Sequence, residues 1–202
     1  MEKATRRRAA PAKKLSKAER RKQLLETAHK IVRAEGGDAL TLGYLAARAG
    51  VTKPIAYEHF ETRAGLLVAL YQEIDDRQVA VLMEALKRAK PRLDDVARVV
   101  AKAFIDCYSA VGPEWHAISA ALKGDEKLER FQQALIDRYA AIYCDAFAPY
   151  TKLPHEELRL RCLAVLGAGD AITRELSRGR TTEIGAATTL TSLIISSLAE
   201  SK

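Results

Sequence analysis

A short stretch that begins at Thr52 combines a hydroxyl, an amine and two polar aromatic side chains. Thr52 and Lys53 precede Pro54 where the pattern starts a short helix, and proline is tolerated there because first-turn amides have no intrahelical partner. Those free N–H groups and the positive end of the helix dipole favour a phosphate. Tyr57 and His59 lie on the same predicted helix. The chemistry that this stretch indicates is phosphate binding.

The positive charge of the chain is concentrated at its N-terminal end. Residues 1–33 contain twelve Lys and Arg against three Glu, whereas the rest contains 21 basic and 23 acidic residues. A basic segment beside a near-neutral body suits attraction to a polyanion such as nucleic acid. A solvated tail and a membrane-surface patch are the alternatives, although the segment lacks the large apolar face that a membrane-surface helix needs. We expect residues 1–15 to be a disordered basic arm.

Recognised catalytic and metal-binding motifs are absent from the sequence. There is no HExxH, GxSxG or Gly-rich phosphate loop, and the four histidines are scattered: His29, His59, His116 and His155. The three cysteines, Cys107, Cys144 and Cys162, are widely spaced without a CxxC, which argues against disulfides and zinc. They are expected to be small buried hydrophobes, with thiol sensing as the alternative. We expect no enzyme, cofactor or metal site; a helical enzyme with an unrecognised site is the first rival class.

Membrane and export signals are also lacking. No run of eighteen apolar residues exists, and no apolar segment of signal-peptide length follows the basic start. We therefore expect a cytoplasmic protein. The second rival class is a helical interaction module whose basic arm meets a membrane surface.

Helical periodicity at the start of the chain predicts three helices. The first begins near Ser16 and ends at Gly36-Gly37, since glycine accepts the left-handed C-terminal conformation. Thr41 is a plausible N-cap for a second, a turn at Gly50-Val51 follows, and Thr52 is a plausible cap for the third. Two short helices joined by a turn with glycine are typical of a helix-turn-helix. We expect this domain to span residues 16–67.

The rest of the chain, residues 68–202, is expected to be a helical bundle, so that the whole fold is all-α. Helices are predicted over 63–88, 93–110, 114–122, 126–147, 155–178 and 182–199. The break after residue 110 is placed at Val111-Gly112-Pro113. No stretch alternates as a strand does.

The last two helices, 155–178 and 182–199, carry apolar stripes that we expect to form a homodimer interface. The stripes are Leu158, Cys162, Val165, Leu166, Gly169, Ile172 and Leu176 in the first and Ile184, Ala187, Thr191, Ile194 and Leu198 in the second. Gly167 and Gly169 would allow close approach of helices. The alternative is that both helices pack only within their own domain.

Residues 24–67 resemble the DNA-binding domain of TetR-family regulators. The matching core reads TLGYLAARAGVTKPIAYEHF, from Thr41 to Phe60. The family pattern has Thr at the start of the second helix, then Ile/Leu-Ala, Ala-Gly-Val, Ser/Thr-Lys and Tyr-x-His-Phe. All of these stand here, and Arg63 with Leu66-Leu67 continues into the family's fourth helix.

The resemblance implies double-stranded DNA as a partner and assigns roles to individual residues. The implied DNA-binding residues are Thr41, Tyr44, Thr52, Lys53, Pro54, Ile55, Tyr57, His59 and Arg63. Phosphate contacts fall to Thr41, Tyr57, His59 and Arg63, and such contacts fix register rather than sequence. Base readout falls to Tyr44, Lys53 and Ile55, with core packing as the alternative for Ile55. Three residues depart from the family pattern: Gly43, Ala56 and Glu58.

For the C-terminal domain the resemblance implies a ligand cavity and a dimer. Candidate lining residues are Phe104, Cys107, Tyr108, Trp115, His116, Tyr139 and Tyr143, with Arg174 and Asp170 as polar anchors; each is alternatively a core residue. The implied function is that of a ligand-responsive repressor, which acts as a homodimer on a near-palindromic operator and responds to an unknown small-molecule effector.

Overall fold

The computed structural model describes residues 15–121 and 126–199, without the side chains of residues 110–121, 127 and 128. Within this part of the chain the fold is all-α, as predicted, with no strand. The α-helices are α1 (Lys17–Glu35), α2 (Leu42–Arg48), α3 (Lys53–Phe60), α4 (Arg63–Arg88), α5 (Leu93–Ala121), α6 (Glu126–Phe147), α7 (His155–Ser177) and α8 (Glu183–Leu198). The expected arm lies outside the described residues apart from Leu15.

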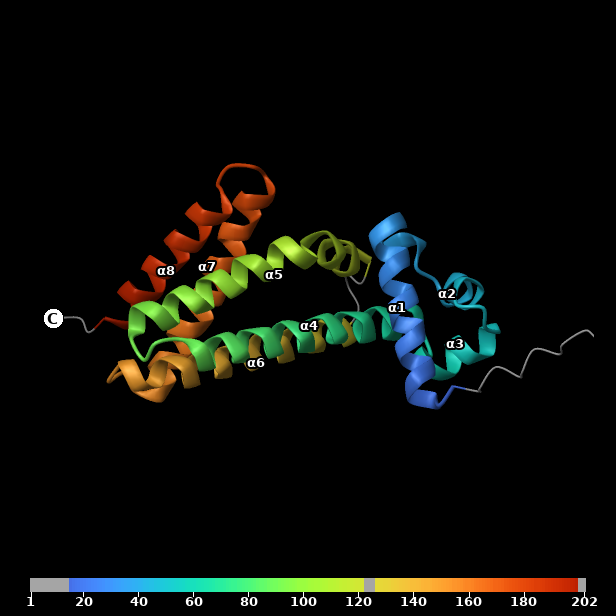
Figure 1. The fold of residues 1–202 in the computed structure, drawn as a ribbon, viewed down its shortest axis with the longest axis horizontal. Helices are drawn as coiled ribbons and strands as arrows, with labels where there is room; N and C mark the ends of the chain where they lie inside the picture. The colour runs from blue at the N-terminus through green and yellow to red at the C-terminus, as the bar shows by residue number, and fades with distance from the viewer. Residues whose placement is uncertain (1–14, 122–125, 200–202) are drawn as a thin grey trace, which may run out of the picture.

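Helices α1 to α3 pack at one end of an elongated molecule (Figure 1). A capping box starts α1, in which Ser16 Oγ accepts from Glu19 N and the Glu19 carboxylate accepts from Ser16 N. Gly36, at a φ of 82°, ends it, and the Thr41 hydroxyl caps α2 as predicted. These caps fix where the helices begin and end, and hence which face each buries.

A tight turn joins α2 to α3. Gly50 takes a φ of 67°, which glycine adopts without a Cβ penalty, and Val51 N donates to Ala46 O. Thr52 is the N-cap residue of α3 and Pro54 lies in its first turn, both as predicted, but the Thr52 side chain makes no cap hydrogen bond. The helix is held instead by burial of its inner face.

The connection from α3 to α4 is a strained turn. Glu61 has a φ of 59° and a ψ of −53°, and Thr62 N donates to Phe60 O across it at 2.5 Å, which is the geometry of a γ-turn. The same carbonyl faces Gly65: a Cβ added there would lie 2.3 Å from Phe60 O. The turn therefore requires glycine at position 65.

Helix α4 belongs to two hydrophobic cores. Its first turns bury Leu66, Leu67 and Leu70 in the core of α1 to α3, whereas Leu82 is buried in a second core with α5 to α8. Tyr71 lies between them, with its ring edge-on to Phe131 of α6 at 5.4 Å. Figure 1 shows α4 running through the molecule, with α7 and α8 beside α5 at the far end.

Helix α5 differs from its prediction. It runs without interruption from Leu93 to Ala121, so the predicted break at Val111-Gly112-Pro113 is wrong. The φ of proline is compatible with a helix, and Pro113 removes only one of the many intrahelical bonds. None of the described helices is both long and apolar enough to cross a membrane.

Candidate DNA interface and ligand cavity

The outer face of α3 is open to solvent. Ala56 and Phe60 are buried, whereas Lys53, Pro54 and Tyr57 are exposed, Tyr57 by 52 %. Ile55 and His59 are half-buried at the edges. A helix that buries one side and presents a lysine and a tyrosine on the other is able to contact a DNA groove and its phosphates.

Lys53 lies across Gly43 of α2. A Cβ at Gly43 would be 3.4 Å from Lys53 Cε and 3.9 Å from Nζ. Gly43 departs from the family pattern, and the Lys53 side chain uses the space that a larger residue there would take. Glycine therefore leaves room for the lysine at the start of α3.

Tyr44 and Arg63, both predicted to contact DNA, form hydrogen bonds with other residues of the chain. The Tyr44 hydroxyl donates to the Glu35 carboxylate at 2.9 Å and accepts from Arg48, whose guanidinium lies 5.7 Å from the Tyr44 ring centre. Arg63 donates to Leu40 O and Gly37 O, both at 2.8 Å. Tyr44 thus ties α2 to the end of α1, and Arg63 ties α4 to the turn before α2.

Arg21 of α1 fixes the end of α3, a role that the sequence analysis missed. Its guanidinium donates to His59 O at 2.7 Å and lies 4.9 Å from the centre of the Phe60 ring. Burial lowers the pKa of His59; Glu58 opposes this shift, and nearby cations including Lys17 add to it. The Glu58 side chain faces solvent, and its Oε1 lies 3.4 Å from Lys17 Nζ.

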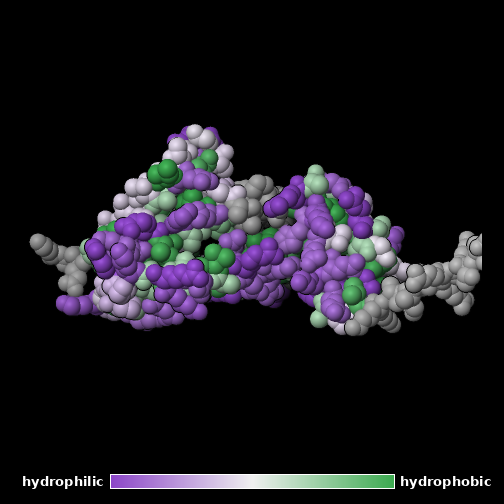
Figure 2. Space-filling view, in the orientation of Figure 1, coloured by the Kyte–Doolittle hydropathy of each residue, from purple (hydrophilic) through white to green (hydrophobic). Residues whose placement is uncertain are grey.

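The C-terminal bundle forms a partly open cavity of about 470 Å³ between α4, α5, α6 and α7. Figure 2 shows apolar surface between α4 and α5, flanked by hydrophilic side chains. Of the residues proposed from the sequence, the structure places Phe104, Cys107, Tyr108, Tyr139, Tyr143 and Asp170 in the wall. Helix α4 forms a further part of the cavity wall that was not predicted from the sequence, and it includes Tyr71, Asp75 and Gln78. The side chains of Trp115 and His116 lie outside the described residues.

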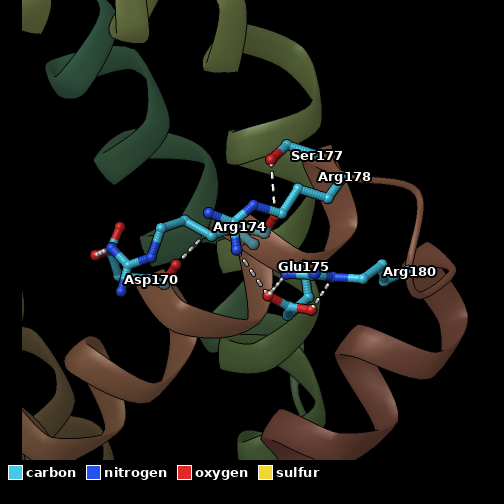
Figure 3. A network of polar contacts seen from close by, with 7 residues as sticks. Asp170, Arg174, Glu175, Ser177, Arg178 and Arg180 are labelled. Atoms are coloured by element: carbon cyan, nitrogen blue, oxygen red, sulfur yellow. Dashed lines mark hydrogen bonds and ion pairs between the residues drawn. The ribbon is translucent and has the colours of Figure 1, made fainter.

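Arg174 does not line this cavity. Figure 3 shows it in a polar network at the end of α7, where its guanidinium binds the Asp170 carboxylate at 2.5 Å. In the same network Glu175 accepts from Arg178 and Arg180. Arg174 is exposed, and it neutralises a wall residue from outside instead of anchoring a ligand.

Asp75 is the buried charged group of the cavity wall, at 3 % exposure. Its carboxylate accepts from Arg138 Nη1 at 2.8 Å and from the Tyr139 hydroxyl, and Arg138 also binds Asp76 at 2.7 Å. Burial nevertheless raises the pKa of Asp75, because desolvation outweighs these bonds. Burial, with a smaller effect of Asp75, likewise raises the pKa of Cys107 to about 11.

The N-terminal domain and the overall fold both have relatives among known proteins. Residues 24–70 match the profile of bacterial regulatory proteins of the tetR family. Solved structures share the whole fold: a TetR-family regulator from Rhodococcus sp. covers 90 % of this chain and all of its own (TM-score 0.72, 18 % identity). A transcriptional regulator from Pseudomonas aeruginosa PAO1 covers 91 % of this chain and 92 % of its own (TM-score 0.74, 15 % identity). Residues 24–70 are thus a DNA-binding domain of the tetR family, and the rest of the described fold is similar to those of the solved structures.

Two proteins similar to this chain carry more specific names. The HTH-type transcriptional activator FasR of Mycolicibacterium smegmatis is 33 % identical over 93 residues, which are 46 % of this chain and only 42 % of the relative. The fatty acid degradation regulator FadR of Bacillus halodurans covers 92 % of this chain and 97 % of its own (TM-score 0.67, 16 % identity). Within the described residues, no group of three or more His, Cys, Asp or Glu is placed to hold a metal ion.

Proposed function

We propose that this chain is a sequence-specific, DNA-binding transcription regulator of the TetR family in the cytoplasm. The observation that carries the proposal is the exposed Lys53–Tyr57 face of α3, which lies inside the segment matched by the family profile. Lys53 donates to base edges, and Tyr57 and the α3 amides hold the phosphate backbone. Thr41 and His59 flank this face, and Tyr44 and Arg63 support it from behind.

Selection from a randomised double-stranded DNA pool tests this proposal. We expect an inverted repeat with half-sites about ten base pairs apart. Tyr57→Ala removes an exposed side chain and is expected to weaken binding to the selected site roughly 10-fold, since phosphate contacts fix register, without changing the melting temperature by more than a degree or two.

The matched control for the selection is Lys87→Ala, which also removes an exposed side chain but lies at the far end of α4. It should bind like the unchanged protein. Absence of an enriched motif at low salt, or equal affinity of Tyr57→Ala and the unchanged protein, would count against α3 as the recognition helix.

We propose that the regulator is a homodimer through the solvent-facing side of α7 and α8. Most residues of the stripes named from the sequence point the other way: Leu158, Cys162 and Val165 are buried in the chain's own core, as are Ile194 and Leu198. Ile184 is the exception and is exposed. Gly169 faces α5, since a Cβ there would lie 2.7 Å from the Phe104 ring. The opposite faces of both helices are exposed and carry Leu160, Ala164, Ala171, Ile184 and Leu193.

The Leu160→Asp/Ile184→Asp double variant tests this interface. These side chains are 64 % and 81 % exposed in the single chain, so the monomer should fold unchanged. A two-fold interface would contain each new carboxylate twice, and we expect dimerisation to weaken by roughly 100-fold or more because charges would be buried unpaired. Analytical ultracentrifugation measures this, with Val81→Asp, also exposed, as control. A double variant that remains a dimer would exclude this surface.

We propose repression as the direction of regulation, with release of DNA when a ligand occupies the cavity. A ligand that prefers a different separation of the two recognition helices shifts the population away from the DNA-bound state. Activation is the alternative and is the direction that the name of the FasR relative states for that protein. Transcription of a reporter behind the selected site, with and without the protein, distinguishes the two directions.

A further inference from the structure

The cavity wall gathers aromatic side chains from three helices. The chain has twelve Phe, Trp and Tyr residues, and five of them line this one cavity: Tyr71, Phe104, Tyr108, Tyr139 and Tyr143. Aromatic faces carry negative partial charge and attract cations that have been removed from water. The volume of about 470 Å³ is that of a site for a drug-sized molecule.

The charged side chains of the wall are all acidic. Asp75 and Asp170 are the only charged residues among the described lining residues, and neither Lys, Arg nor His is among them. Arg138 and Arg174 bind these carboxylates but do not line the cavity. An anionic ligand would therefore face two carboxylates and no cation, whereas a positive group would meet acceptors and aromatic faces.

The difference in burial between the Asp75 and Asp76 side chains also indicates a ligand. Both bind the same Arg138 nitrogen, but the Asp76 side chain is 57 % exposed and that of Asp75 is 2 % exposed. Burial raises the pKa of Asp75, so its charged form is held at a cost to the free protein. A cation in the cavity would offset this cost, since opposite charges interact strongly where water is excluded.

We propose that the cavity binds an organic cation with an apolar body, whose positive group lies against Asp75 and the tyrosine rings. This inference rests on the proposed function in taking the cavity as the effector site. It specifies the chemical class of the effector and disfavours carboxylates such as fatty acids.

Two probes with the same apolar tail and opposite head groups test the inference. Decyltrimethylammonium and decanoate, both below their micelle concentrations, are titrated into the purified full-length protein by calorimetry. We expect the cation to bind about 10-fold more tightly or better, as expected for aromatic and carboxylate contacts away from water. Asp75→Asn should reduce that preference to within about 3-fold.

Asp76→Asn is the matched control, because it also removes a carboxylate from Arg138 but lies outside the cavity wall. It should keep the full preference. If Asp75→Asn does not fold, Asp170→Asn serves instead, because it removes an exposed carboxylate of the cavity wall. It should lower the affinity for decyltrimethylammonium and leave the affinity for decanoate unchanged. Equal or tighter binding of decanoate, no binding of either probe, or a preference that neither wall variant changes would overturn the inference. The titration needs no DNA, so its failure would leave the DNA selection result intact.

Discussion

Gly65→Ala is expected to destabilise the protein by about 3 kcal/mol, at the upper end of the cost of forcing extra atoms into packed structure. The new methyl would lie 2.3 Å from Phe60 O, a backbone atom already bonded to Thr62 N. Relief requires the γ-turn at Glu61 or the first turn of α4 to open. For a chain of this length the loss corresponds to a fall in melting temperature of roughly 9 °C, measurable by circular dichroism.

Gly43→Ala is the matched control for Gly65→Ala, since both glycines lie in early helical turns of the same domain. Its methyl would meet only the flexible Lys53 side chain at an ordinary 3.4 Å, and alanine favours a helix over glycine by about 0.5–1 kcal/mol. We expect an unchanged or slightly higher melting temperature. Equal melting temperatures for the two variants would show that the α3–α4 turn tolerates a side chain at position 65.

Arg63→Ala is expected to lower the free energy of unfolding by about 2 kcal/mol, since bonds from a charged donor are worth about 1.5–3 kcal/mol each and the group is about one-third exposed. Two backbone carbonyls lose their hydrogen-bond donor. The carbonyl of Leu40, a fully buried residue, accepts no other hydrogen bond among those described. Arg63→Lys should restore less than half of the loss, because an ammonium does not span both carbonyls as the guanidinium fork does.

The stability of Arg63→Ala also separates two roles for this residue. A phosphate-binding arginine would lose DNA affinity and keep its melting temperature, as expected for Tyr57→Ala. The structure instead predicts that melting temperature and DNA affinity fall together. An unchanged chemical denaturation midpoint in Arg63→Ala would restore the direct phosphate contact as its main role.

The helix-turn-helix could be predicted from the sequence because its signals are local. Thr41 caps its own helix, Gly50 takes a left-handed conformation, and both are properties of a few neighbouring residues. The end of α1 at Gly36 follows the same logic. Where a helix starts and stops is fixed within one turn of chain, so residue types alone reveal it.

The turn at Glu61 and the route of α5 could not be predicted in this way. Glutamate rarely takes a positive φ, and only the packing of α3 on α4 requires it here. Gly112-Pro113 normally ends a helix, yet α5 continues through both. At Glu61 the local preference is outweighed by the packing of α3 on α4.

The cavity was foreseen only in part. Aromatic residues at helical spacing look the same whether they fill a core or line a space, so Tyr108 and Tyr139 could be named but not distinguished from core. Asp75 was missed because acids are almost never buried unless they are paired, and its partner Arg138 lies 63 residues away. Arg21 was missed for the same reason, since its contact with His59 spans 38 residues.

The shared helix α4 has a consequence for how the molecule comes apart. Neither hydrophobic core is complete without it, and the Tyr71–Phe131 contact joins the cavity wall to the N-terminal core. Because opening either core would fray the same 26 residues, we expect the two halves to unfold as one cooperative unit. A molecule held in the cavity then slows amide hydrogen exchange in α1 to α3, far from where it binds.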